Sequence, residues 1–254
     1  MKIPSKKFWE WTLAAVLGVL VIGVVGFVIW ALNTPPVGQL ATSALENTDS
    51  VKVEQHNGVN FKPVNPNGTG LVLYQGAKVP PASYAYAAKQ IANEGYTVFI
   101  PQLPLNLAVF DIDAAAKTIE ANSSLKCWVV GGHSLGGAMA AEYAKDNTVA
   151  GLVLWAAYPA DSNNLSKSDV KVMSISGTRD GLSTPEKVEA SKRNLPKGTE
   201  YVAIEGGNHA QFGDYGSQSG DNKADISLKD QQTQIAQATL QLLGRPDLCS
   251  ELER

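Results

Sequence analysis

A serine between glycines carries the strongest chemical signal in this sequence. The segment Gly132-His133-Ser134-Leu135-Gly136 has the pattern G-x-S-x-G, and it directly follows the apolar run CWVV. The small-residue segment AMAAEYA comes after it and is typical of a helix. A serine on such a strand-to-helix turn presents its hydroxyl as a nucleophile, and a β-carbon at either glycine would collide with the neighbouring strand and helix. We therefore expect Ser134 to be a catalytic nucleophile rather than part of a plain glycine-rich turn.

A nucleophilic serine needs a base, and the chain has only three histidines. His56 precedes the first strong strand pattern, and the side chain of His133 should diverge from its neighbour Ser134 on the turn. His209 remains, in the segment GGNH directly after the run EYVAIEG. The chain order serine, acid, histidine is the order that parallel sheets with this turn use. We expect His209 to be the general base.

The acid that orients the base should lie between the serine and the histidine, at the carboxyl end of a strand. Asp180 meets this requirement best, because it stands in GTRDG just after the run VMSIS. Asp161, which follows an earlier apolar run, remains the alternative. A purely structural role for Asp180, as part of a turn-forming Asp-Gly pair, is the other interpretation.

Two backbone N–H groups should stabilise the oxyanion that forms during attack on a carbonyl. We expect one from Leu135, at the start of the helix after the serine, where N–H groups point toward the site. We expect the other from Ala77, in the loop after the run GLVLYQG.

These residues need a scaffold, and the hydrophobic pattern supplies one. Short apolar runs alternate with helix-like segments along the chain, which predicts an α/β fold with a mostly parallel sheet and helices on both faces. Strands are predicted at 58–64, 70–76, 96–101, 126–132, 150–157, 170–176 and 200–206. Helices are predicted at 82–94, after Asp111 or Asp113, from the serine to about 145, and at 185–194 and 229–243. The polar segment 158–169 is too short for a cap domain with its own core. We therefore expect an open cleft, reached from water, that takes small or partly polar acyl groups rather than long lipid chains.

The N-terminal segment has a different character. Residues 13–32 contain no charge, and a helix of that length spans roughly 30 Å, which matches the hydrocarbon core of a bilayer. Lys2, Lys6 and Lys7 precede it, which predicts a cytoplasmic N-terminus and an extracytoplasmic remainder. We expect a short cytoplasmic segment over 1–12, a single transmembrane helix over 13–32, a linker over 33–57 and the catalytic domain over 58–254. A cleaved signal peptide is the alternative, although its apolar region is usually shorter.

Charge and cysteine content exclude other classes of protein. The net charge of −3 argues against binding to nucleic acid, which needs a basic face. Cys127 and Cys249 are too few for a disulfide scaffold and too far apart for a zinc-ligand pair. We expect them to be structural or free, although an extracytoplasmic location permits a disulfide. We expect neither a metal ion nor an organic cofactor.

The motifs together resemble the alpha/beta-hydrolase superfamily across residues 58–245, through GHSLGG, GTRDG and the histidine after the last strand. Within it, YQGAKVPPASYAYAAKQIANEGYTVFIPQLPLNLAVF and GGNHAQFGDYGSQSGD look like the membrane-anchored bacterial fold-5 hydrolases, which are related to dienelactone hydrolases. Two departures are visible. Gln75-Gly76 stands where many members have His-Gly, and serine stands where dienelactone hydrolases have cysteine.

The resemblance implies a hydrolase without naming its substrate. We expect a membrane-tethered serine esterase that acts on a small-molecule ester through Ser134, Asp180 and His209. An acyltransferase on the same fold and an inactive binding domain at the cell surface are the alternatives.

Overall fold

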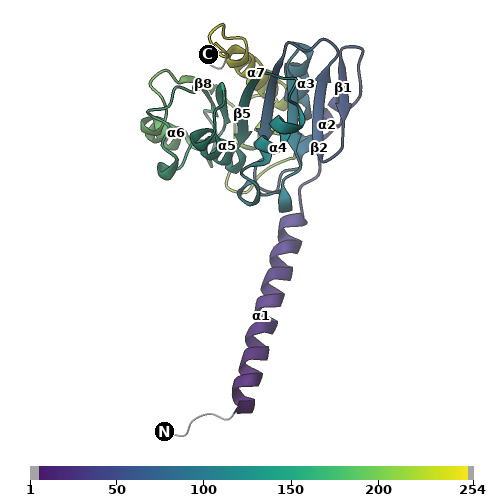
Figure 1. Cartoon of the computed structure of the whole chain (residues 1–254), viewed down its shortest axis with the longest axis vertical. Helices are drawn as coiled ribbons and strands as arrows, with labels where there is room; N and C mark the ends of the chain where they lie inside the picture. The colour runs from purple at the N-terminus through teal and green to yellow at the C-terminus, as the bar shows by residue number, and fades with distance from the viewer. Residues whose placement is uncertain (1–5, 251–254) are drawn as a thin grey trace.

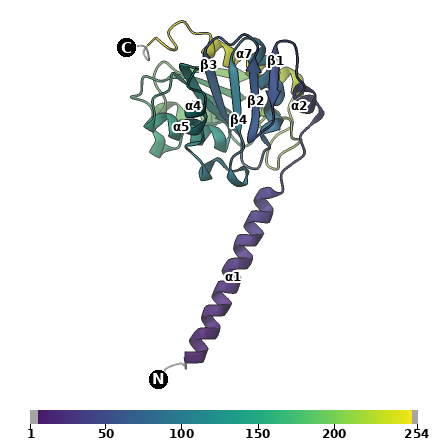
Figure 2. The same cartoon turned by 45° about the vertical axis from the view of Figure 1, so that its right-hand side comes forward.

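The computed structural model describes residues 6–250, and a single eight-stranded sheet forms the centre of their globular part (Figures 1 and 2). The strand order is β1-β2-β4-β3-β5-β6-β7-β8. Strands β3 to β8 are parallel to one another, whereas β2 runs antiparallel to both β1 and β4. The strands are β1 (Val51–Glu54), β2 (Gly58–Pro63), β3 (Thr69–Tyr74), β4 (Thr97–Pro101), β5 (Cys127–His133), β6 (Gly151–Trp155), β7 (Lys171–Gly177) and β8 (Glu200–Ile204).

Helices cover both faces of the sheet, as the sequence predicts. One core layer forms between the sheet and α2, α3 and α7, and a second forms between the sheet and α4 and α5. The helices of the globular part are α2 (Gln39–Ala44), α3 (Ala85–Asn93), α4 (Ala114–Ala121), α5 (Leu135–Asp146), α6 (Pro185–Ser191) and α7 (Leu228–Leu243). Short 3-10 turns complete the loops: η1 (Pro81–Tyr84), η2 (Pro104–Asn106), η3 (Ala108–Phe110), η4 (Asp161–Asn163), η5 (Lys192–Asn194) and η6 (Ala210–Phe212).

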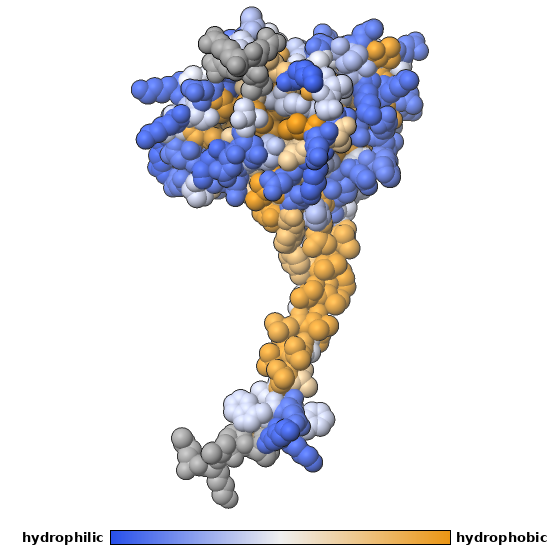
Figure 3. Space-filling model, in the orientation of Figure 1, coloured by the Kyte–Doolittle hydropathy of each residue, from blue (hydrophilic) through white to orange (hydrophobic). Residues whose placement is uncertain are grey.

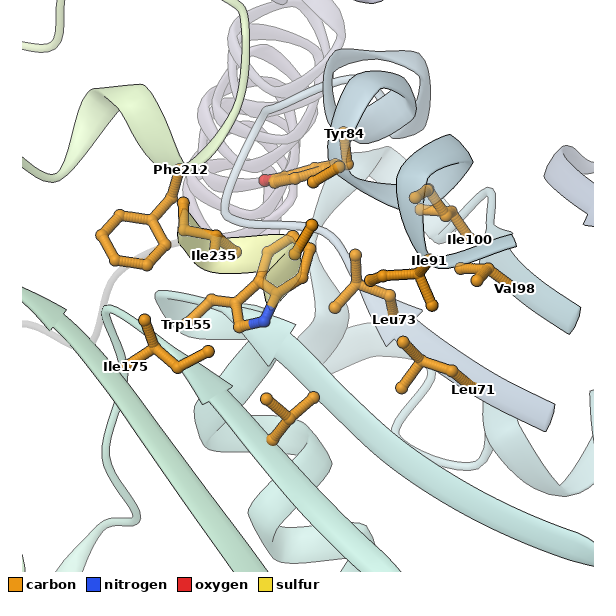
Figure 4. Packing of buried hydrophobic residues seen from close by; sticks show 14 of the residues in the cluster. Leu71, Leu73, Tyr84, Ile91, Val98, Ile100, Trp155, Ile175, Phe212 and Ile235 are labelled. Atoms are coloured by element: carbon orange, nitrogen blue, oxygen red, sulfur yellow. The ribbon is translucent and has the colours of Figure 1, made fainter. Parts of the chain in front are cut away.

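The first core layer centres on a large buried side chain of β6. Trp155 is fully buried and packs among Ile235, Leu73 and Tyr84 (Figure 4). Its indole Nε1–H donates a hydrogen bond of 3.0 Å to the hydroxyl of Thr239 on α7, which satisfies the single polar group of the ring. This contact holds α7 against the strand next to β5, and so supports the strand that ends at the serine.

The globular part begins earlier than the sequence predicts. The segment 33–57, expected to be a linker, contains α2 and β1, and Ala41, Ala44 and Val51 from it are buried in the first core layer. The expected linker is thus corrected to the few residues before α2. The pattern hides this because α2 spans only six residues and β1 only four, too few to show a period.

Helix α1 (Lys6–Leu32) projects from the globular part as a single long helix, and its C-terminal end contacts that part through Phe27 and Trp30 (Figure 1). It is apolar and long enough to cross a membrane, and its most apolar stretch is unburied by the rest of the chain. Residues 6–12 of the expected cytoplasmic segment form its first turns, while residues 1–5 and 251–254 lie outside the described range.

The two cysteines form a disulfide. Cys127 begins β5 and Cys249 lies beyond α7, with 5.7 Å between their Cα atoms. The bond joins the C-terminal segment to the strand that ends at the serine turn.

Candidate active site

Ser134 stands between the end of β5 and the start of α5, as the sequence predicts. Its φ of 53° and ψ of −122° lie in a region that non-glycine residues rarely adopt. Its backbone N–H donates to the carbonyl of Trp155 on the adjacent strand β6, which holds the turn in place. The side chain is half-buried and therefore open to a substrate. Such a strained turn at the carboxyl end of a sheet presents the hydroxyl as a nucleophile.

The glycines around the serine are there because backbone approaches backbone. A β-carbon on Gly132 would lie 2.5 Å from the carbonyl carbon of Gly136, and one on Gly136 would lie 2.3 Å from the carbonyl oxygen of Gln75. Both distances are far below van der Waals contact with atoms that cannot rotate away. The first turn of α5 therefore packs directly on β5 and on the loop after β3.

Asp180 and His209 come together as a buried pair. The Oδ2 atom of Asp180 lies 2.8 Å from Nδ1 of His209, and both side chains are almost completely buried. The other oxygen, Oδ1, accepts from the N–H groups of Leu182 and Ser183, at 2.8 and 2.7 Å. These three hydrogen bonds orient the carboxylate. They also direct the Nδ1 proton of His209 to Asp180 and leave Nε2 as the acceptor.

The alternative acid, Asp161, lies elsewhere. Its carboxylate is exposed at η4 and accepts from Arg193 and Asn194. The hydrogen bond from Asn194 and the Arg193 guanidinium lower its pKa. The pairing of His209 with Asp180 therefore favours the acid after β7 over the acid after β6.

The imidazole of His209 lies beside the serine turn. Its ring centroid is 4.6 Å from that of His133, the residue directly before Ser134. Among residues 6–250, the Nε2 atom of His209 is buried without a hydrogen-bond partner. A buried polar atom left unpaired destabilises a fold by about 1–3 kcal/mol. Nε2 of His133 is unpaired in the same way, so it is the contact with Asp180 that singles out His209.

His133 itself is held away from the chemistry. Its Nδ1 lies 3.0 Å from the hydroxyl of Tyr84, and its ring stacks on Phe212 at 5.7 Å. Burial, followed by the nearby His209, lowers the pKa of His133 well below its usual value, so this imidazole is neutral. Burial raises the pKa of Tyr84, so its phenol stays protonated. The phenol O–H therefore donates a hydrogen bond to Nδ1 of His133. The same phenol oxygen accepts from the N–H of Gly76, at 2.8 Å.

The two expected oxyanion donors stand on neighbouring loops. Leu135 is the first residue of α5, and the first N–H groups of a helix have no partner within it. Ala77 is exposed in the loop after β3, and among residues 6–250 its N–H donates to no carbonyl or side chain. Gly76 packs against His133, and Gln75 packs against Gly136, so the two loops are in contact. Gln75 is buried and donates to the side chain of Asn106, at 3.1 Å.

The sequence did not single out Asp221 for a structural role. One oxygen of Asp221 accepts from the N–H of Gly181, and the other accepts from the N–H of Ala210. It therefore joins the turn after Asp180 to the residue after His209. Asp214, Asp221 and Asp225 stand in a polar segment of the sequence that looks like a solvated loop, and only the folded chain shows what Asp221 contacts.

Comparison with known proteins now places the chain. Residues 70–233 match the family described as the alpha/beta hydrolase family. The chain belongs to the alpha/beta hydrolase family. This confirms the resemblance drawn from the motifs and identifies the chain as an enzyme of the hydrolase type. None of the curated proteins matches this alpha/beta hydrolase.

Solved structures share the fold at low sequence identity. The esterase domain of a Rhodothermus marinus protein is 14% identical, with a TM-score of 0.57 over 75% of this chain and 92% of that chain. A hydrolase from Thermoplasma acidophilum described as CIB-like is 16% identical, with a TM-score of 0.54 over 78% and 94%. Esterase 2 of Thermogutta terrifontis, in a form phosphorylated by paraoxon, is 14% identical, with a TM-score of 0.52 over 78% and 96%. These likenesses concern the fold.

Proposed function

We propose that this alpha/beta hydrolase is a serine esterase that cleaves carboxylic esters through Ser134, Asp180 and His209. The observation that carries the proposal is the buried Asp180–His209 pair. The ring of His209 packs beside the serine turn, and its Nε2 atom has no hydrogen-bond partner among residues 6–250. Two structural neighbours, the Rhodothermus marinus domain and the Thermogutta terrifontis enzyme, are esterases, which supports an ester as the substrate.

In the proposed mechanism the Ser134 Oγ attacks the ester carbonyl carbon while Nε2 of His209 takes its proton. The N–H groups of Leu135 and Ala77 stabilise the oxyanion. Collapse of the tetrahedral intermediate breaks the bond to the alcohol oxygen, which leaves with the proton from His209. Water then attacks the acyl-serine by the same route, releasing the acid and restoring the serine. Asp180 orients the imidazole and stabilises its cationic form.

We further propose that α1 anchors the enzyme in a membrane, with the globular part on the extracytoplasmic side. The apolar stretch of α1 supports a membrane span, and Lys6 and Lys7 at its start support a cytoplasmic N-terminus. The disulfide between Cys127 and Cys249 supports the side, because disulfides persist in oxidising compartments.

Hydrolysis of p-nitrophenyl acetate by the full chain tests the esterase proposal. Ser134→Ala and His209→Ala should each lower kcat by several orders of magnitude, leaving only the residual activity that binding and the oxyanion donors supply. Because the two groups act as one unit, the double variant should be about as slow as either single variant. Activity that survives Ser134→Ala at the wild-type rate would remove Ser134 from the mechanism.

A further inference from the structure

The outer end of α1 packs against the edge of the sheet where the candidate site lies. The ring of Phe27 contacts that of Phe110 in η3 edge-on, with 6.2 Å between centroids. The ammonium of Lys78 lies 4.3 Å from the centre of the Trp30 ring. Lys78 follows Ala77 in the loop after β3, and η3 belongs to the loop after β4. Carboxyl ends of parallel strands share one edge, so α1 leaves the globular part from the catalytic edge.

The segment that connects α1 to the globular part is tied to the same edge. The N–H of Gly38 donates to the carbonyl of Asp214 at 2.8 Å, and the N–H of Ala41 donates to its carboxylate at 2.9 Å. Asp214 is buried, follows His209 by five residues, and so places a negative charge at the start of α2. Contacts on three loops around the site thus set the direction in which α1 leaves it.

Exposed apolar side chains gather at this junction. Among the described residues after α1, the exposed large apolar side chains are Val64, Val109, Phe110 and Tyr201. Phe27 contacts both Phe110 and Trp30, and the exposed Val109 directly precedes Phe110 in the chain. We call these four residues the apolar rim. The apolar colour of α1 continues onto the adjoining edge of the globular part (Figure 3).

The depth of Phe27 sets the depth of the rim. Phe27 stands five residues before the end of α1, which is roughly 7.5 Å along the helix axis. If α1 spans a bilayer, as we propose above, Phe27 lies within the apolar part of the membrane or at its boundary. The ring of Phe110 is 6.2 Å from that of Phe27, so the depths of the two rings differ by no more than this distance. The loop that carries Phe110 therefore enters the bilayer surface.

Hydrogen bonds connect this loop to the expected oxyanion loop. The carbonyl of Asn106 accepts from the N–H of Lys78 at 2.8 Å, and its side-chain oxygen accepts from Gln75 and from Gln102. Leu105, Asn106 and Lys78 all have positive φ, so these hydrogen bonds hold strained backbone in place. The apolar rim and Ala77 consequently belong to one connected unit.

We propose that the apolar rim inserts into the outer surface of the bilayer, so that the catalytic edge faces the membrane and takes esters that partition into it. The substrates are amphiphilic acyl esters whose apolar part stays in the lipid while the ester reaches Ser134. This inference rests on the proposed anchoring by α1. It changes the expectation of a site reached from water, because the catalytic edge faces the lipid surface.

The position of the rim is measured on the full chain in phosphatidylcholine vesicles that carry a nitroxide quencher on a fraction of the lipids. A fluorophore is attached to the single new thiol of Phe110→Cys or of Val64→Cys, because the native cysteines pair with each other. Val64 is the matched control, since both side chains are 51% exposed and Val64 follows β2 at the opposite edge of the sheet. Emission from position 110 should be quenched several-fold more than emission from position 64. Equal quenching in protein that resists carbonate extraction overturns the inference and leaves the anchor intact, whereas release by carbonate refutes the anchor itself.

The substrate class is tested by the ratio of two rates on the same vesicles. One substrate is a fluorogenic ester held in the bilayer by a long alkyl chain, and the other is water-soluble p-nitrophenyl acetate. Phe110→Ser should lower the ratio of the vesicle-borne rate to the soluble rate by about tenfold, because the rim loses its main apolar contact. Val64→Ser should keep the wild-type ratio. A wild-type ratio in Phe110→Ser contradicts the proposal, while loss of both activities in Ser134→Ala is required by the esterase function alone.

Discussion

At the scale of residues, the candidate site depends on how each imidazole is hydrogen-bonded. The Nδ1–H of His209 donates a hydrogen bond to the carboxylate of Asp180. Nδ1 of His133 instead accepts a hydrogen bond from the hydroxyl of Tyr84. Two histidines with rings 4.6 Å apart are thereby given opposite roles. Nε2 of both rings lacks a hydrogen-bond partner among residues 6–250, so it is the carboxylate at Nδ1 that suits His209 to act as a base. His133, paired with a phenol instead, is a neutral support for the loop at Gly76.

The choice of acid gives the first prediction at this scale. Asp180→Asn should lower kcat by roughly 10⁴-fold, because an amide at this position favours the wrong tautomer of His209. Asp161→Asn is the matched control and should leave kcat unchanged, since its carboxylate contacts Arg193 and Asn194 rather than the imidazole. Steady-state kinetics on p-nitrophenyl acetate compares them. A larger loss in Asp161→Asn would mean that the acid follows β6.

The buried, neutral His133 gives a prediction about pH. Burial and the nearby His209 lower its pKa in the folded chain, so the unfolded chain binds a proton that the folded chain does not. The free energy of unfolding should therefore fall as pH drops below about 6.5. His133→Asn cannot take up that proton and should lose correspondingly less between pH 7.5 and 5.5. Denaturant melts at the two pH values measure the difference, and equal losses would show that His133 does not titrate on unfolding.

At the scale of elements, the sequence predicts most of what positions the site. The seven predicted strands all form, because continuous apolar runs such as the one before Ser134 fit strands buried on both faces. The turn, its glycines and the loops that carry Asp180 and His209 follow from motif and strand end together. Sequence alone leaves out α2, β1 and the roles of Tyr84 and Asp221. Those depend on contacts between residues far apart in the chain, which no local period records.

The close approach of α5 to the loop after β3 gives a prediction for an element. Gly136→Ala should destabilise the fold by about 1–3 kcal/mol, because the new β-carbon meets the carbonyl oxygens of Gln75 and Tyr74. Gly198→Ala is the matched control, since a β-carbon there meets no atom within 4 Å, and its effect should stay within about 0.5 kcal/mol. Urea denaturation gives both values. A stable Gly136→Ala variant with full activity would mean that the turn and the β3 loop have room to separate.

At the scale of the whole molecule, three features join one account. A long apolar helix leaves the globular part from the edge that carries the candidate site. The disulfide joins Cys127, at the start of β5, to Cys249 in the C-terminal segment, and such a bond suits an oxidising compartment. The polar segment between β6 and β7 holds only the short turn η4 and forms no cap over the catalytic edge. The loop after β3, which carries Ala77 at this edge, also contacts α1 through Lys78. Helix α1, the proposed anchor, and the candidate site are thus in contact through these loops, rather than separated by a free tether.

The central claim is that Ser134 is a nucleophile activated by His209, and covalent labelling with paraoxon tests it most directly. Attack by the serine oxygen on phosphorus, with loss of p-nitrophenolate, adds one diethyl phosphoryl group to the chain. Peptide mass spectrometry of the full chain should find that group on Ser134 at one per molecule, and His209→Ala should react orders of magnitude more slowly although its serine is intact. A wild-type protein that releases no p-nitrophenolate, or that carries the label on another residue, contradicts the account.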